Sequence, residues 1–142
     1  MNKKILILVL ACVIAVSAIA AVSATGQAVN FGDFNLTIDG SISDNQTSDE
    51  VSIIEFNGTK DQVDVMIMPG SFDESKVMNN FESDDTLEKV DDVNGFSIFK
   101  NKNTSDAHQY QAVKVIPDKD AVVVFFNDLD NGKAIVKTFA EN

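Results

Sequence analysis

Six consecutive apolar residues, Ala121–Phe126, constrain the fold of this chain more than any other stretch. The run is too short for a buried helix and is rich in β-branched and aromatic side chains, which is typical of a strand covered on both faces. Asp128 follows as a candidate N-cap, because its carboxylate can accept the free amide hydrogens of a first helical turn. The apolar residues after Leu129 are Ile135, Val136, Phe139 and Ala140, which share one helical face. The sequence therefore predicts a central strand with a C-terminal helix packed across the sheet.

The rest of the chain alternates short apolar patterns with turn signals. Asn94–Gly95 is the strongest hairpin signal, since both residues tolerate the positive φ angles of a tight turn. Ser71–Glu74 has the S-x-x-E pattern of a capping box and predicts a helix over 72–81. Residues 40–50 are polar and predict a loop. The predicted strands are 34–38, 51–56, 63–68, 87–93, 96–100, 108–116 and 121–126.

These elements indicate one domain, because 142 residues are enough for a single core and not for two. We expect an α+β fold with a mainly antiparallel sheet of about six to seven strands, packed with two helices. The C-terminal helix is expected to cover the sheet. The earlier helix is expected to bury Val77, Met78 and Phe81.

The first 24 residues have the layout of a secretory signal. Lys3 and Lys4 form a basic head, Ile5–Ala21 is apolar except for one serine, and Val22–Ala24 offers small residues to a signal peptidase. We expect cleavage after Ala24, with an alternative cut near Ala20. The predicted organisation is a signal at 1–24, a short flexible lead at 25–30 and one domain at 31–142.

Two other interpretations of this segment stay open. Ile5–Ala24 is long enough for one bilayer core, so it can also be an uncleaved anchor. Cys12 hints at a lipoprotein cut, although the apolar run continues beyond it. The expected location is extracellular or at the cell surface after export, with anchoring by residues 5–24 as the alternative.

Composition restricts the partners and the chemistry. All 11 basic residues are Lys, against 22 acidic residues, which gives a net charge of −11. Such a negative field without Arg argues against nucleic acid and anionic membrane as partners, so membrane contact is expected only through an uncleaved N-terminal segment. Cleavage after Ala24 removes two Lys and the single Cys, which leaves 9 Lys, a charge of 9 − 22 = −13, and no thiol. Disulfides, Cys–metal sites and Cys nucleophiles are then excluded, and no cofactor is expected.

The only histidine, His108, follows Ser105 and Asp106, so the residue types of a catalytic triad are present. No G-x-S-x-G elbow presents a serine, and a triad is assembled from separate parts of a fold. We therefore expect His108 to be a surface or edge residue and name no catalytic residue.

Acidic residues cluster in several places and raise the question of calcium. In the stretch 127–132, placing Gly132 at the sixth position of an EF-hand loop puts Leu129 at the third and Thr138 at the twelfth. Neither is a ligand of the required type, so the EF-hand interpretation fails and N-capping explains Asp128. A looser calcium site stays open, but no metal ligand is named.

Four N-x-S/T sequons are candidate acceptors for N-linked glycans in an exported chain. Three fall in predicted loops or turns, and the first lies on the polar face of a predicted strand. The acceptors are Asn35, Asn45, Asn57 and Asn103.

The order of motifs resembles a known domain. It runs from an opening strand at Phe34–Ile38 through a V-x-V-x-I-x-P strand at Val63–Pro69, a capped helix and the N-G hairpin to a terminal helix at Lys133–Phe139. This layout resembles the Mog1/PsbP-like α/β/α sandwich, here in a small secreted prokaryotic protein, over most of residues 31–142. The I-P-x-G-W motif of that family is absent, because Ile38 is followed by Asp39–Gly40. The resemblance implies a non-catalytic accessory or assembly domain and carries over no functional residue.

The sequence thus favours an exported, non-enzymatic binding or accessory domain at the cell envelope, with an unknown partner and an unknown oligomeric state. The alternatives are a calcium- or small-ligand-binding module and a carboxylate-based secreted hydrolase. Loss of binding after chelation would indicate the first alternative, and two carboxylates facing each other in a deep pocket would indicate the second.

Overall fold

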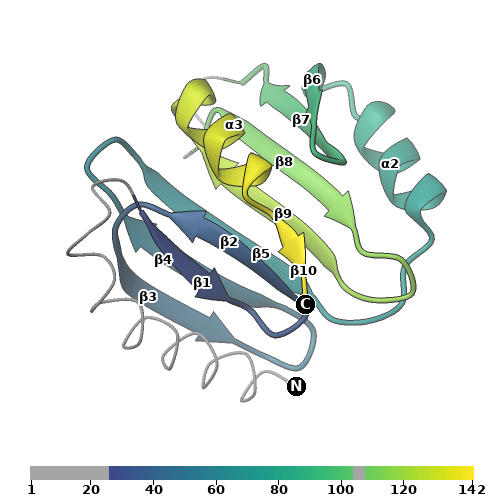
Figure 1. Ribbon diagram of the computed structural model, residues 1–142. Helices are drawn as coiled ribbons and strands as arrows, with labels where there is room; N and C mark the ends of the chain where they lie inside the picture. Colours follow the sequence, from purple (N-terminus) through teal and green to yellow (C-terminus); the bar gives the residue numbers. More distant parts are fainter. Residues whose placement is uncertain (1–25, 104–107) are drawn as a thin grey trace.

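The computed structural model describes residues 26–103 and 108–142, which form two antiparallel sheets and two helices (Figure 1). The larger sheet has seven strands in the order β3-β4-β5-β9-β8-β7-β6, and the smaller has three in the order β1-β2-β10. The strands are β1 (Gln27–Asn30), β2 (Phe34–Ile38), β3 (Ser41–Thr47), β4 (Ser52–Asn57), β5 (Gln62–Met68), β6 (Leu87–Val93), β7 (Phe96–Asn101), β8 (Tyr110–Val115), β9 (Ala121–Phe126) and β10 (Ala140–Glu141). The helices are α2 (Glu74–Glu82) and α3 (Leu129–Lys137). The predicted α+β class, with a mainly antiparallel sheet and a C-terminal helix packed on it, is confirmed.

The predicted central strand is β9, the fourth of the seven strands. Val122, Val124 and Phe126 point into one hydrophobic layer, and Val123 and Phe125 point into the other. Successive residues of a strand face opposite sides of the sheet, so this unbroken apolar run serves both layers at once.

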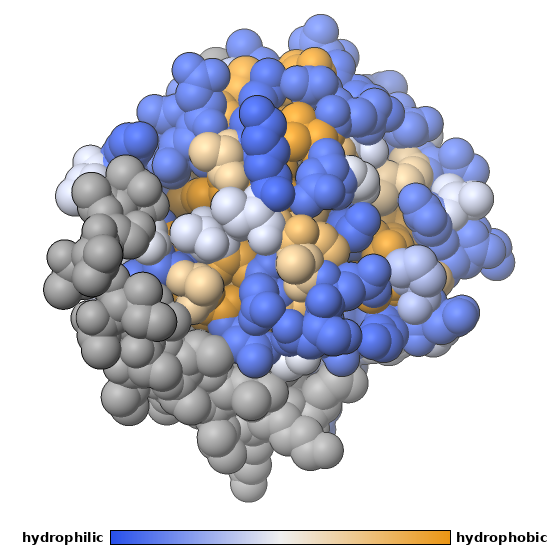
Figure 2. Space-filling view, in the orientation of Figure 1, coloured by the Kyte–Doolittle hydropathy of each residue, from blue (hydrophilic) through white to orange (hydrophobic). Residues whose placement is uncertain are grey.

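The inner layer lies between the large sheet and the small sheet with α3, which are in front in Figure 1. Aromatic rings connect the parts of this layer. Phe34 of β2 stacks on Phe139 at 5.3 Å between ring centroids, and Phe139 meets Phe96 of β7 edge-on at 5.3 Å. Hydrophilic side chains dominate the surface of the molecule on this side (Figure 2).

The outer layer is smaller and lies under α2. Val77, Met78 and Phe81 of this helix pack against the buried side chains of Phe99, Val113 and Val123. The prediction that these three helix residues are buried was too strong, because no residue of α2 is fully buried. The helix contacts β6 and β8, so it covers only one half of the outer surface of the sheet.

The structure corrects the predicted start of α2. The N-cap is Asp73, whose carboxylate accepts the amide hydrogen of Lys76, and not Ser71 of the predicted capping box. Aspartate and serine are equally good N-cap residues, so the sequence alone allows the helix to begin after Ser71 or after Asp73. The backbone of the structure begins the helix after Asp73.

Three strands were missed by the sequence analysis. The predicted loop 40–50 contains β3, which is polar because it lies at the edge of the sheet and pairs only with β4. The predicted lead 25–30 contains β1, which pairs with β2. The predicted helical face extended to Ala140, but α3 ends at Lys137 and Ala140 belongs to β10.

Side-chain hydrogen bonds cap both ends of α3. At its start, the Asp128 carboxylate accepts the amide hydrogen of Asn131, which confirms the predicted N-cap. At its end, the Asn94 amide in the β6–β7 turn donates to the carbonyl oxygens of Val136, Lys137 and Phe139 at 3.0–3.2 Å. The predicted Asn94–Gly95 hairpin is confirmed, with positive φ angles at both residues, and its turn also caps the helix.

The two edge strands of the large sheet, β3 and β6, share one structural feature, a β-bulge beside an aspartate. Each has a register shift, next to Asp44 in β3 and next to Asp91 in β6. In each, the aspartate carboxylate accepts the amide hydrogen of the following residue at 2.8 Å. Bulges, charges and occupied amide groups all oppose pairing with a further strand.

The contact between α3 and β9 depends on Gly132. A Cβ atom at this position would clash with the ring of Phe126, which is fully buried. Glycine therefore allows the helix to lie directly on the aromatic ring of the central strand.

We expect Gly132→Ala to destabilise the protein by about 1–3 kcal/mol, because overpacking of a core has this cost. Helix propensity alone predicts the opposite sign, a gain of about 1 kcal/mol. Chemical denaturation of the purified variant measures the change in the free energy of unfolding.

Ala134→Gly, at an exposed position of the same helix, is the matched control for Gly132→Ala. It should lose only about 0.5–1 kcal/mol through helix propensity. A Gly132→Ala variant more stable than wild type would show that the helix does not need this close approach.

Candidate functional site

Three carboxylates form a row across the half of the sheet that α2 leaves uncovered. In the strand register, Asp44 of β3 lies opposite Glu55 of β4, and Glu55 lies opposite Asp64 of β5. Residues directly opposite each other in antiparallel strands have Cβ atoms about 4.5–5.5 Å apart, and like charges at such positions destabilise a sheet. We call this surface, with Gln46 and Ile53 of the neighbouring row, the acidic face.

Among the three carboxylates of this row, Asp64 is in the least favourable environment for a charged group. Its side chain is only 18% exposed, and its Oδ1 atom is buried without a hydrogen-bond partner. Burial raises the pKa of the Asp64 carboxyl above its ordinary value, while His108 and Gln62 lower it and Glu55 and Asp44 raise it further. A buried oxygen without a donor costs stability, so packing alone does not explain this carboxylate.

The other two carboxylates have donors. The Ser43 hydroxyl donates to Glu55 Oε1 at 2.7 Å, and the Asp44 carboxylate accepts from the Asn45 amide and the Gln46 side chain. The unsatisfied hydrogen-bonding capacity of the row is thus concentrated at Asp64.

His108 borders the acidic face. Its Nε2 atom lies 3.7 Å from Asp64 Oδ2, its ring lies 5.8 Å from that of Phe125, and its carbonyl oxygen accepts a hydrogen bond from Asn101. The His108 side chain is 12% exposed, so it is more buried than the surface position that the sequence predicted for it. In the described ranges no hydroxyl is hydrogen-bonded to its imidazole, and residues 104–107, with Ser105 and Asp106, lie outside those ranges.

A small cavity adjoins the acidic face at the β3–β4 turn. Its volume is about 280 Å³, and Gln46, Ser48, Val51 and Ile53 are among its lining residues. Ile53 and Glu55 are two residues apart on one strand, which places them about 7 Å from each other on the same face. A carboxylate row and a small cavity lined by both polar and apolar side chains therefore lie side by side on this surface.

The acidic face is not a metal site as it stands. Within residues 26–103 and 108–142, no three His, Cys, Asp or Glu side chains are close enough together to hold a metal ion. In the stretch considered for calcium, Asp128 acts as a helix cap. The looser calcium site stays a prediction without a location.

The four sequons lie apart from one another. The Asn35 side chain in β2 donates to Asn142 Oδ1 at 2.6 Å, and Asn45 Oδ1 in β3 accepts from the hydroxyl of Thr47 in its own sequon. Asn57 is exposed at the end of β4, and Asn103 is exposed after β7. Asn45 is therefore in a strand and not in the predicted loop. Glycan attachment stays a prediction at all four.

A second pair of carboxylates lies at the other end of the fold. Asp120, just before β9, is 5% exposed, and its Oδ1 atom accepts the amide hydrogen of Gly70 at 3.2 Å. Burial raises the pKa of the Asp120 carboxyl, and the neighbouring Asp33 carboxyl raises it further, while the Gly70 amide and Lys119 lower it. Neither carboxylate lines the 390 Å³ or the 280 Å³ cavity of the described residues.

Comparison with known proteins gives no relative: no family model, no curated protein and no solved structure matches this chain. In the part of the chain that the structure describes, no helix has the length and apolar character needed to cross a bilayer. The predicted signal or anchor at residues 1–24 and the lipoprotein cysteine Cys12 lie outside the described residues.

The acidic face was not predicted from the sequence. Alternation in β5 placed Asp64 on the same face as Met66 and Met68, and a carboxylate on a partly apolar face was the available signal. Its neighbours could not be found in this way, because β3 was predicted as a loop and the register of β4 and β5 is not visible in the sequence.

We expect Asp120→Asn to raise the stability at neutral pH by about 1 kcal/mol, because the amide oxygen keeps the Gly70 hydrogen bond and the new NH₂ group can donate to Asp33. The folded state raises the Asp120 pKa, so wild-type stability falls as pH rises from the unfolded value of 3.8 through the raised folded value. The gain should therefore vanish below pH 3.8. Urea denaturation across pH measures it, and an equal gain at every pH would contradict a charge-based origin.

Proposed function

We propose that this protein is an exported, non-enzymatic binding domain of the cell envelope that captures a cationic segment of a partner protein on its acidic face. The observation that carries the proposal is the row of three adjacent carboxylates on the uncovered half of the sheet, which ends at Asp64 with its buried, unpartnered Oδ1 atom. Ammonium or guanidinium groups from a partner would pair with the accessible oxygens of the row and neutralise its charge.

Charge complementarity argues for a partner with Lys or Arg side chains. Asp44, Glu55 and Asp64 lie in one row, and the whole chain carries a charge of −11. A field of this sign accelerates the association of cationic partners and opposes anionic ones. The row spreads three charges over three strands, which suits several basic side chains better than one metal ion.

The surroundings of the row argue for a protein rather than a free cation. Ile53 of the acidic face is half-buried, and the adjacent cavity of about 280 Å³ can accept an apolar side chain. A partner segment that places a basic and an apolar side chain about 7 Å apart would contact both features. Interfaces commonly combine such an apolar anchor with charged groups around it.

Export is the other part of the proposal, and it is supported by the basic head, apolar middle and small-residue end of residues 1–24. The resemblance to Mog1/PsbP-like domains, which stays a prediction, fits the same accessory role. A catalytic role would need a nucleophile next to the pair of His108 and Asp64, and among the described residues no hydroxyl group is hydrogen-bonded to this histidine.

The binding proposal predicts opposite effects of one substitution on stability and on binding. Asp64→Asn should raise the free energy of unfolding at about pH 8, where histidine side chains are generally neutral, because a buried carboxylate without a full set of donors is removed. The same variant should bind a synthetic peptide of the repeat Lys-Ser-Leu-Ser, which places Lys and Leu on one face of an extended chain, about tenfold more weakly. Chemical denaturation and calorimetric titration measure the two effects.

Asp85→Asn is the matched control, since it removes one exposed carboxylate in the turn between α2 and β6. It should leave both quantities close to those of the wild type. Peptide binding should also weaken between about 50 and 500 mM salt. Equal affinity of the Asp64→Asn and wild-type proteins for the peptide would rule out the acidic face as the binding surface.

The export proposal has its own measurement. The intact mass of the protein from its native host should correspond to residues 25–142, with added glycan mass if the sequons are used. Protein found in the cytosol with residues 1–24 attached would overturn export and leave the peptide-binding result unaffected.

A further inference from the structure

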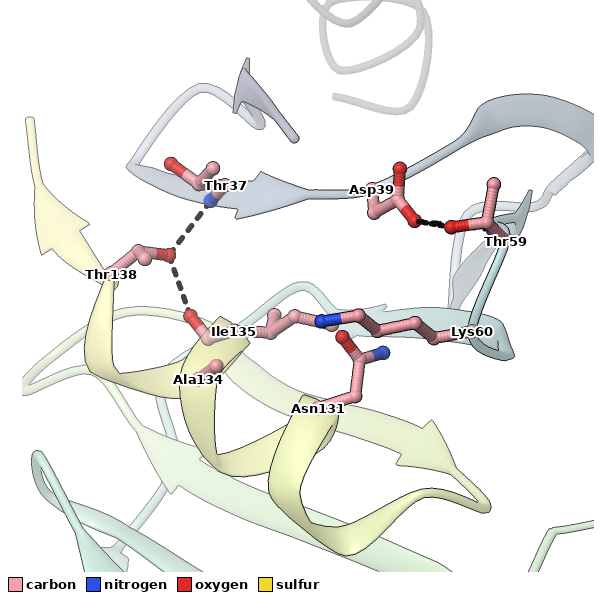
Figure 3. A pocket seen from close by; sticks show the side chains of 8 residues that line it. All are labelled: Thr37, Asp39, Thr59, Lys60, Asn131, Ala134, Ile135 and Thr138. Atoms are coloured by element: carbon pink, nitrogen blue, oxygen red, sulfur yellow. Dashed lines mark hydrogen bonds between the residues drawn. The ribbon is translucent and has the colours of Figure 1, made fainter. Parts of the chain in front are cut away.

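A second, larger cavity lies on the opposite side of the large sheet from the acidic face. Its volume is about 390 Å³, which is within the range of small-molecule sites. Three segments form its walls, namely β2, the β4–β5 turn and α3 (Figure 3). Its lining includes Thr37, Asp39, Lys60, Asn131, Ala134 and Ile135.

One wall is held by a rigid contact between two turns. Asp39 Oδ2 accepts the Thr59 amide hydrogen at 3.1 Å and the Thr59 hydroxyl hydrogen at 2.7 Å. Gly58 is pressed against this segment, since a Cβ atom there would lie 2.6 Å from the Asp39 carbonyl oxygen. The β4–β5 turn that carries Lys60 is therefore fixed against the end of β2.

The opposite wall is held by Thr138, the C-cap of α3. Its hydroxyl accepts the Thr37 amide hydrogen at 2.8 Å and donates to the Ile135 carbonyl oxygen at 2.6 Å (Figure 3). These contacts hold β2 against α3 at one end of the cavity and against the β4–β5 turn at the other, so the cavity exists before any ligand binds. Such preorganisation lowers the entropic cost of binding.

Polar groups in this cavity remain available. Figure 3 shows the Lys60 side chain reaching from the β4–β5 turn toward α3, where Asn131 also lines the cavity. Among the described residues, neither the Lys60 ammonium nor the Asn131 side-chain amide has an ion pair or a hydrogen bond, and Asp39 Oδ1 also accepts none. Ala134 and Ile135 add an apolar surface between them.

We propose that this cavity binds a small zwitterion of the α-amino acid class. The Lys60 ammonium and the Asn131 amide donate to its carboxylate, and the Asp39 carboxylate accepts from its ammonium group. Its side chain lies on Ala134 and Ile135. A zwitterion is favoured over a plain anion because the cavity holds one charge of each sign, whereas the whole protein is strongly negative.

The test uses the full-length protein and three probes of the same carbon skeleton: L-leucine, 4-methylpentanoate without the amine, and 3-methylbutylamine without the carboxylate. L-leucine should bind with a Kd of about 1 mM or tighter in calorimetric titration, and each analogue at least about tenfold more weakly. Lys60→Met should weaken L-leucine binding by about tenfold, and Ala134→Leu should abolish it by filling the cavity.

Lys76→Met, on the exposed surface of α2, is the matched control and should bind L-leucine like the wild type. Absence of L-leucine binding up to about 10 mM would overturn the proposal. Equal binding of 4-methylpentanoate would overturn the assignment to zwitterions, and unchanged binding by Lys60→Met would overturn the location. None of these results depends on the acidic face, which is tested with a different probe and different variants.

Discussion

The contact of Gly132 with the Phe126 ring is the constraint on which the rest of the fold depends. It brings α3 onto the central strand of the sheet, and the helix in turn lies against β2 of the small sheet. Burying an aromatic side chain such as Phe126 contributes about 1.5–3 kcal/mol, and the helix excludes water from its ring. The small sheet, the aromatic chain through Phe139 and the cavity beside α3 are all arranged relative to this one close approach.

Long-range polar contacts then fix the position of the two ends of α3, which apolar packing alone does not determine. The Asp61 carboxylate accepts the amide hydrogens of Asn127 and Asp128 at 2.6 and 2.9 Å, which anchors the β9–α3 junction to the β4–β5 turn. Asn94 caps the other end of the helix from a hairpin 42 residues away in the sequence. The Asn94 contacts satisfy carbonyl groups at the C-terminal end of α3, which have no intrahelical partner, and the Asp61 contacts fix the segment from which the helix begins. They also explain how a short helix can stay fixed between the small sheet and the large sheet.

The sequence could predict the features that depend on local pattern. The apolar run of β9, the N-cap at Asp128 and the Asn94–Gly95 turn each carry their own signal, and the structure contains all three. It could not predict β3, because an edge strand with little burial lacks the alternation by which strands are found. The acidic face depends on the register of three strands, and the cavity beside α3 depends on how Lys60 and Asn131 approach across the fold. Tertiary packing determines which of these side chains come close together. The sequence could therefore predict the fold class but not the candidate sites.

The aspartate bulges of β3 and β6 have a consequence for contacts between copies of this protein. Pairing of a second copy with either margin of the seven-stranded sheet is opposed, because both margins present a bulge and an already occupied amide group. Recognition is thereby directed to the broad surfaces of the sheet, where specificity comes from side chains rather than from the generic backbone.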